Sequence, residues 1–112
     1  MTADAQIALA AAVDRMWVQY LPLTEERVSA LETAAKAFAE DRLSIEQHEA
    51  AQAAAHKLAG VLGTFGLTRG TVLAREAEIM FSRQNGPDPE LAGKLAEIAA
   101  ELRVIVASRG SR

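Results

Sequence analysis

Five stretches of the chain carry apolar residues that recur every three or four positions, a spacing that places their side chains on one face of an α-helix. No stretch shows the alternation of apolar and polar residues that is typical of a β-strand. Aromatic residues make up 4% of the chain, whereas alanine, the strongest helix former, accounts for 24 of its 112 residues. The expected helices span residues 5–21, 24–38, 67–83 and 88–107, together with a third helix that begins at residue 44 and ends between residues 60 and 65.

Residues that stop, start or cap helices separate these stretches. Pro22 is expected to end the first helix, because the residue before a proline is pushed out of the helical region, and Thr24 is expected to cap the second. Ser44 and Gln47 form a capping box at the start of the third helix, and Asp88 caps the last. Amphipathic helices joined by short connections bury their apolar faces by packing antiparallel to one another. We therefore predict an all-α fold, an antiparallel up-down four-helix bundle with an additional N-terminal helix.

The length of 112 residues fits one domain, which we expect to span residues 1–107 and to be followed by a flexible tail or truncated linker at residues 108–112. The chain has no cysteine, which excludes disulfides and thiolate metal ligands, and its formal charge of −3 argues against binding to nucleic acid or to an anionic membrane. Its longest N-terminal apolar run, residues 7–13, lacks the basic flank of a signal peptide and is shorter than the roughly 20 residues of a membrane span. We expect a cytoplasmic protein.

The third stretch contains a histidine, His56, on a face unlike the rest of its helix. At about 100° per residue, Leu62 and Phe65 fall on the opposite side, which faces the core, so that His56 is expected to point to solvent. The residues around it are small or polar, and we predict that a partner docks on them: Gln52, Ala53, Ala59, Gly60 and Gly63. A glycine inside a helix costs about 1 kcal/mol relative to alanine, so two glycines beside the histidine favour a surface that a partner approaches closely. In the alternative interpretation, Gly60 or Gly63 ends a shorter helix.

Residues 56–66 form the motif HKLAGVLGTFG, which begins with this histidine. The motif resembles the signature of histidine-phosphotransfer (Hpt) domains, the phosphorelay modules of two-component signalling. In that family an apolar residue stands two places after the phosphoacceptor histidine, glycine stands four places after it, and small residues or glycine stand seven and ten places after it. The matching residues here are Leu58, Gly60, Gly63 and Gly66. The helical layout also fits the family, so the resemblance covers nearly the whole chain.

The chain departs from the family pattern at Ala59, because the family commonly has a lysine there that interacts with the phosphoryl group. Lys57 is the nearest cation to His56 in the sequence and is our candidate for stabilising the phosphoryl group. Arg69 and Arg75 in the next helix are weaker candidates for this role, and we interpret each as an ordinary surface charge.

The resemblance implies that His56 is the phosphoacceptor of a phosphorelay. It would exchange the phosphoryl group with an aspartate of a response-regulator receiver domain, and a hybrid histidine kinase is the other expected partner. A solvent-exposed imidazole is largely neutral at pH 7 and therefore nucleophilic. No carboxylates converge beside this histidine in the sequence, so we expect no bound cofactor in this chain and Mg²⁺ on the receiver domain instead. The chain would thus be a phosphoryl carrier rather than a stand-alone enzyme.

The chain has a second histidine, His48, in the same predicted helix. It lies about 80° round the helix and roughly 12 Å along it from His56, so the two histidines cannot share a metal ion. We expect no metal site, and we interpret His48 as a surface residue near the start of its helix.

A second function from a different class also fits the same residues. In this alternative the chain is a non-catalytic helical docking module that binds a signalling partner through the small-residue face, because a fold alone does not establish a chemistry. The absence of the family lysine at Ala59 favours the docking module, whereas an exposed histidine among small residues favours the phosphorelay.

Overall fold

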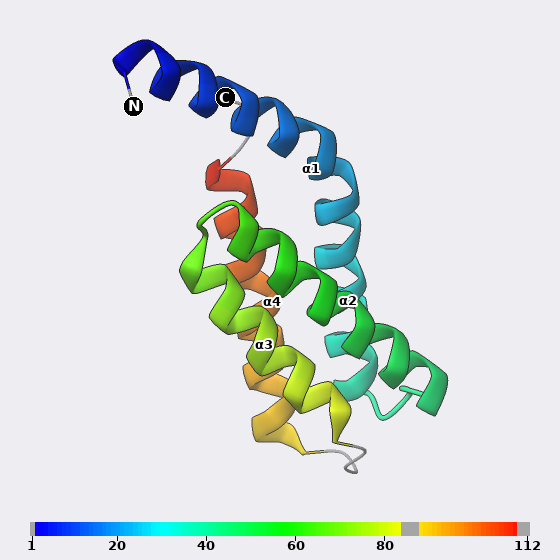
Figure 1. Cartoon of the computed structure of the whole chain (residues 1–112). Coiled ribbons are helices and arrows are strands. Elements are labelled where there is room, and N and C mark those ends of the chain that lie inside the picture. The colour runs from blue at the N-terminus through cyan, green and yellow to red at the C-terminus, as the bar shows by residue number, and fades with distance from the viewer. Residues whose placement is uncertain (1, 84–87, 110–112) are drawn as a thin grey trace.

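The structure, a computed structural model, describes residues 2–83 and 88–109, and every element within these residues is an α-helix. The four helices are α1 (Ala3–Ala39), α2 (Ile45–Thr64), α3 (Thr68–Ser82) and α4 (Pro89–Arg109). They run alternately in opposite directions, and each packs against the next, with α4 returning to lie beside α1 (Figure 1). The predicted all-α antiparallel bundle is confirmed.

α1 continues through Pro22 as one helix of 37 residues, so the predicted helix break at this proline is wrong. A proline inside a helix removes one backbone hydrogen bond and kinks the helix, and Figure 1 shows that α1 bends before its N-terminal part reaches out past the bundle. Trp17 and Val28 are fully buried on either side of the proline, and their packing holds both halves of the helix against the bundle. The predicted additional helix is thus the first half of α1.

Thr24 lies inside α1 and does not cap a helix, in contrast to the prediction. Its side chain is buried, and its hydroxyl donates a hydrogen bond to the Tyr20 carbonyl oxygen at 2.8 Å. This bond satisfies the hydroxyl within the helix itself, which explains how a threonine is accommodated in the core at this position.

The start of α2 has the predicted capping box. The Ser44 side chain accepts a hydrogen bond from the Gln47 backbone N–H at 3.1 Å, and the Gln47 side chain accepts one from the Ser44 backbone N–H at 2.7 Å. Two backbone donors that have no partner within the helix are thereby satisfied. Asp88 caps α4 as predicted, with a carboxylate oxygen 3.0 Å from the Glu90 backbone nitrogen.

Ser44→Ala is expected to lower the free energy of unfolding by about 1 kcal/mol, because the Gln47 N–H loses its acceptor at the start of α2. Ser108→Ala is the matched control, since Ser108 is exposed near the end of α4, where alanine is the better helix former. Urea unfolding followed by circular dichroism measures both changes. Equal losses of stability in the two variants would contradict the capping role.

α2 ends at Thr64, so Gly60 and Gly63 lie inside the helix and do not end it. Gly66 follows in the left-handed region, with a φ angle of +73°, and its N–H donates a hydrogen bond to the Gly63 carbonyl oxygen. Glycine adopts this backbone conformation without steric cost. The turn at Gly66 therefore closes α2 and lets α3 pack back against it.

The core is built mainly from alanine and leucine, which lets the helices approach one another closely. The largest fully buried side chains include Trp17, Phe81, Leu31, Leu58, Leu62 and Leu102. At Gly70 of α3, an added Cβ atom would lie 2.9 Å from the Cδ1 atom of Leu62, so the absence of a side chain there permits close contact with α2. This contact sets the position of α3 relative to α2, and with it the surroundings of His56.

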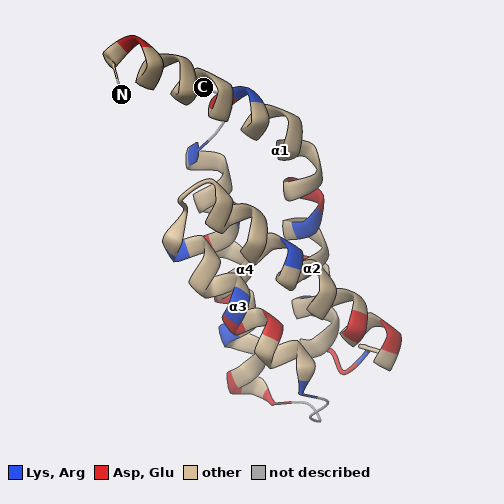
Figure 2. Ribbon diagram, in the orientation of Figure 1, with Lys and Arg blue, Asp and Glu red and all other residues tan. Residues whose placement is uncertain are grey.

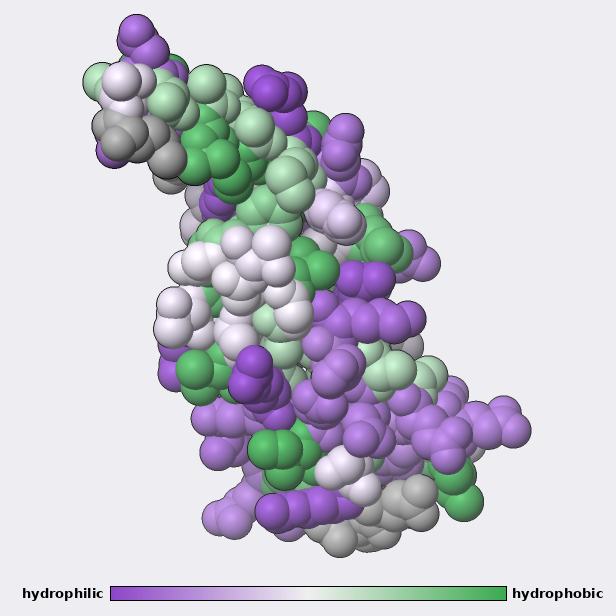
Figure 3. Space-filling view, viewed as in Figure 1, coloured by the Kyte–Doolittle hydropathy of each residue, from purple (hydrophilic) through white to green (hydrophobic). Residues whose placement is uncertain are grey.

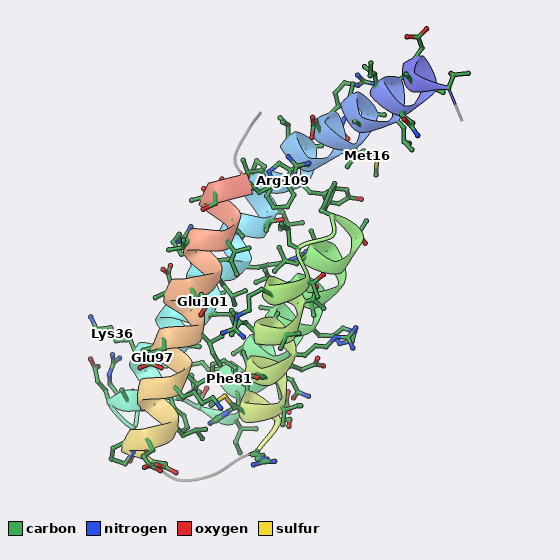
Figure 4. All side chains as sticks on the ribbon, turned by 90° about the vertical axis from the view of Figure 1, so that its left-hand side faces the viewer. Met16, Lys36, Phe81, Glu97, Glu101 and Arg109 are labelled. Atoms are coloured by element: carbon green, nitrogen blue, oxygen red, sulfur yellow. The ribbon has the colours of Figure 1, made fainter. Side chains whose placement is uncertain are left out.

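Two ion pairs tie α1 to α4. Arg103 of α4 lies 2.6 Å from a carboxylate oxygen of Glu32, and Arg109 lies 2.7 Å from one of Asp14. The Arg109 guanidinium also lies 5.5 Å from the ring centre of Trp17, and Figure 4 shows Arg109 at the end of α4, close to α1. The cation and the aromatic ring attract each other, so the C-terminal end of α4 is anchored on the first half of α1.

The described part of the chain continues two residues beyond the predicted domain boundary, because α4 runs through Ser108 to Arg109. Residues 110–112, the rest of the predicted tail, lie outside the described residues.

Figure 3 shows a mostly hydrophobic surface along the N-terminal part of α1 and a mostly hydrophilic surface lower on the same face. Within residues 2–83 and 88–109, no helix is long and apolar enough to cross a membrane.

Candidate functional site

His56 lies on the exposed side of α2, where its imidazole contacts the neighbouring helix α3. Its side chain is 74% exposed, and its Nδ1 atom lies 2.9 Å from the Oε2 atom of Glu78. A carboxylate only accepts hydrogen bonds, so the proton of the neutral imidazole is placed on Nδ1, from which it donates to Glu78. The Nε2 atom then keeps its lone pair and can act as a nucleophile.

Glu78 is not among the residues predicted from the sequence, because it lies on a different helix from His56. The structure shows the register that brings the two residues together. A Cβ atom at Gly63 would lie 3.3 Å from the Thr71 hydroxyl oxygen, so Gly63 of α2 lies opposite Thr71 of α3. The two helices are antiparallel, and seven residues separate Gly63 from His56 on α2 as they separate Thr71 from Glu78 on α3. His56 therefore lies opposite Glu78. The register of two packed helices depends on the side chains that lie between them, so it cannot be predicted from the apolar periodicity of one helix.

Most residues of the predicted docking face surround His56 on the surface. Ala53, Gly60 and Gly63 are exposed, and Gln52 is half-buried. Lys57, the candidate for stabilising the phosphoryl group, is exposed next to His56. At Gly60 no atom lies within 4 Å of the place where a Cβ atom would stand, so the surface beside the histidine is open.

Ala59 does not belong to this exposed face, and its assignment to the docking face is corrected. It is 4% exposed and part of the core, and its carbonyl oxygen accepts a hydrogen bond from the Thr71 hydroxyl at 3.2 Å. The prediction placed Ala59 about 60° from His56 on the helix. It did not account for α3, which covers that side of α2.

His48 is buried, so its interpretation as a surface residue is wrong. Its side chain packs between the rings of Phe38 and Phe81, with centroid distances of 6.2 and 6.4 Å, and its Nδ1 atom lies 3.4 Å from the Phe81 carbonyl oxygen. The seven-residue spacing from His48 to Ala55 places both residues on the core face of α2, which is a signal that the sequence contains. His48 is therefore a packing residue, separate from the exposed His56.

Arg69, on α3, is bound to α4 and not to the histidine site. Its Nε and Nη2 atoms donate hydrogen bonds to the two carboxylate oxygens of Glu101, at 2.7 and 3.2 Å. Hydrogen bonding to this carboxylate raises the pKa of Arg69, and the same bond lowers the pKa of Glu101. Figure 4 shows Glu101 on α4, so Arg69 is held at the edge of α3 that borders α4.

The described residues offer no convergent set of metal ligands. No group of three or more histidine, aspartate or glutamate side chains in residues 2–83 and 88–109 could hold a metal ion. The exposed imidazole of His56 has one ring nitrogen hydrogen-bonded to Glu78.

The chain is similar to a known protein family and to a curated protein. The model of the Hpt domain family matches residues 15–107 of the chain. Among curated proteins, the chain is 28% identical over 100 residues to protein RcaC of Microchaete diplosiphon. This alignment covers 89% of the chain but 15% of that relative, so the chain corresponds to a small part of it. No solved structure matched the chain.

The range matched by the family model contains His56, Glu78 and the whole α2–α3 hairpin. Hpt domains take part in the phosphotransfer relays of two-component signalling, where they interact with receiver domains and kinases. Because the family model covers the bundle from α1 to α4, the chain belongs to the Hpt domain family.

Proposed function

We propose that His56 accepts a phosphoryl group from the aspartate of a response-regulator receiver domain and returns it, as an intermediate of a phosphorelay. The observation that carries this proposal is the contact of the exposed imidazole with Glu78, in which Nδ1 lies 2.9 Å from Oε2. A histidine with one ring nitrogen held in place and the other available is prepared for nucleophilic attack. Membership of the Hpt family supports phosphotransfer as the reaction class.

The transfer step requires one covalent exchange. The lone pair of His56 Nε2 attacks the phosphorus of the aspartyl phosphate, and an N–P bond forms while the P–O bond to the aspartate breaks. The aspartate leaves as a carboxylate with the bonding electron pair. The positive charge that develops on the imidazole is balanced by Glu78, whose carboxylate accepts the hydrogen bond from Nδ1. The reverse steps return the group to an aspartate.

The receiver domain would dock on the exposed side of α2, around His56. Ala53, Gly60 and Gly63 present little or no side chain there, so the partner backbone can come close to the imidazole. Lys57 adds a positive charge that complements an acidic receiver site, and Figure 2 shows basic residues on both α2 and α3. In this proposal the Mg²⁺ of the receiver neutralises part of the charge on the phosphoryl group during transfer.

Transfer from a panel of receiver domains, each phosphorylated with acetyl phosphate, tests the proposal. The expected product is a phosphate on this chain that is stable in base and labile in acid, which is the behaviour of phosphohistidine. If a phosphorylated receiver binds the chain and no such phosphate forms, the phosphorelay proposal fails. The non-catalytic docking module would then describe the chain instead.

Gly60→Ala is expected to slow phosphoryl transfer from a receiver by about tenfold, because a methyl group would rise beside His56 and shift the docked partner. The same change should raise the free energy of unfolding by about 0.5–1 kcal/mol, since Gly60 lies inside α2 and an added Cβ atom meets nothing within 4 Å. Quenched-flow transfer and urea unfolding measure the two effects.

Gly93→Ala is the matched control for this prediction. Gly93 lies inside α4, where an added Cβ atom also meets nothing within 4 Å. Gly93→Ala should raise the free energy of unfolding by a similar amount, and its rate of phosphoryl transfer should equal that of wild type. If the variant at Gly60 transfers as fast as the variant at Gly93, close approach of the partner at Gly60 is not required.

A further inference from the structure

A phosphoryl group on His56 brings negative charge to a place that already holds a carboxylate. Such a group carries roughly −1.5 to −2 charges at neutral pH, and Glu78 lies 2.9 Å from the imidazole. The phosphoryl group on Nε2 lies across the ring from the Nδ1–Glu78 contact, so two negative groups flank one imidazole. Their repulsion disfavours the phosphorylated state unless a cation compensates it. The lysine and arginine residues of α2 and α3 are Lys57, Arg69 and Arg75.

The register of the α2–α3 hairpin places Arg75 beside the site. The contact of His56 with Glu78 and the approach of Gly63 to Thr71 define this register. Arg75 lies between the two α3 residues, four positions after Thr71 and three before Glu78, so all three share the edge of α3 that borders α2. Arg75 therefore lies opposite the turn of α2 that follows His56.

That turn of α2 has room for a phosphoryl group and for an arginine side chain. Gly60 occupies it, and no atom lies within 4 Å of its missing Cβ position. Ala59 is buried in the same turn and projects no long side chain over it. Arg75 is exposed, and a helical turn has a pitch of about 5.4 Å, so its long side chain can extend over this turn toward His56.

The other two cations are placed differently. Arg69 is bound to Glu101 at the α4 edge of α3. Lys57 follows His56 directly, and the rotation of about 100° per residue places it on the side of α2 away from α3, so it and Arg75 lie on different sides of the imidazole. Unlike Arg69, neither Arg75 nor Lys57 forms an ion pair with a described residue.

We propose that Arg75 binds the phosphoryl group carried by His56, an inference that rests on the proposed function. The guanidinium presents parallel N–H donors that match two phosphoryl oxygens at once. Arg75 forms no covalent bond and exchanges no proton. It neutralises the charge on the phosphoryl group while the bond to Nε2 forms and breaks. The cation thus comes from α3, whereas the lysine common in the family would stand on α2 at the position of Ala59.

The test phosphorylates His56 with phosphoramidate, a donor that needs no receiver, and titrates the phosphoryl group by ³¹P NMR. Arg75→Ala is expected to raise the titration midpoint by about half a pH unit, because the doubly charged form loses its cation. It should also slow transfer to a receiver about tenfold. Arg75→Lys should recover part of both effects, and the control Arg69→Ala should behave as wild type. Circular dichroism confirms that each variant is folded.

A titration midpoint in Arg75→Ala equal to that of wild type would overturn the proposal. A larger shift in Lys57→Ala would also overturn it and would assign the cation to Lys57. If Arg69→Ala shifts the titration midpoint as much as Arg75→Ala does, the shift reflects net charge alone, and the proposal is overturned. Failure of phosphoramidate to modify His56 would overturn both proposals. If the phosphorylated wild type passes its group to no receiver, the proposed function fails separately, and the titration still decides the role of Arg75.

Discussion

Replacing His56 by glutamine is expected to reduce phosphoryl acceptance from a receiver to less than about one thousandth of the wild-type rate, because the amide side chain is not a nucleophile of comparable strength. His56 is 74% exposed, so this substitution should change the free energy of unfolding by less than about 0.5 kcal/mol. The docking face is unchanged, and the affinity for the receiver should stay within about threefold of wild type. Transfer of radiolabelled phosphate and titration calorimetry measure the two quantities.

The other histidine of α2 provides the contrast for this experiment. His48 is buried beside Phe81, so His48→Gln is expected to lower the free energy of unfolding by about 1–3 kcal/mol. The folded fraction of this variant should still accept the phosphoryl group at His56. If the variant at His56 accepts the group at more than about a tenth of the wild-type rate, another residue is the acceptor and the proposed function is wrong.

Replacing Glu78 by glutamine is expected to slow phosphoryl transfer by about 10- to 100-fold without preventing docking. The Glu78 carboxylate only accepts hydrogen bonds, which keeps the imidazole proton on Nδ1 and the lone pair on Nε2. An amide at this position can donate to Nδ1 and so favour the tautomer in which Nε2 carries the proton. The substitution also removes the negative charge that balances the imidazole during the attack.

Two measurements separate this positioning role from a structural one. The transfer rate reports the chemistry, and the ¹⁵N chemical shifts of the His56 ring report the tautomer. Glu76→Gln is the matched control, because Glu76 is a carboxylate on the same helix that has no hydrogen bond to His56, and within the described residues only Glu78 forms such a bond. Its transfer rate should stay within about twofold of wild type. A variant at Glu78 with the wild-type rate and the wild-type tautomer would show that the contact has no part in transfer.

Helix ends that are set by neighbouring side chains could be predicted from the sequence. Ser44 and Asp88 cap α2 and α4 as expected, because a capping bond joins residues only two or three positions apart. The break expected at Pro22 does not occur. Trp17 and Val28 are buried on either side of it, and this tertiary packing outweighs the local preference for a helix end. Such packing cannot be read from the residues next to the proline.

The same distinction between local and tertiary information applies to the candidate site. His56 could be found because its exposure follows from the period of one helix. The burial of Ala59 and the approach of Glu78 both depend on how α3 lies against α2. That placement follows from contacts such as the one between Gly70 and Leu62, which join residues on different helices. A single helical period contains no information on this register.

The burial of His48 is a different case, because its signal was present in the sequence. His48 lies seven residues before Ala55, which is two helical turns and therefore the same face of α2. Its polarity favoured a surface position, whereas the rings of Phe38 and Phe81 enclose it in the structure. The helical period was the better guide here than the polarity of the side chain.

The location of the phosphate after transfer from a receiver tests the central proposal most directly. Mass spectrometry with a fragmentation method that preserves the N–P bond identifies the residue, and NMR of the ¹⁵N-labelled imidazole distinguishes its two nitrogen atoms. We predict one phosphate, on His56 and bonded to Nε2, with the Nδ1 proton still directed to Glu78. A phosphate on another residue, or on Nδ1 of His56, would contradict this mechanism.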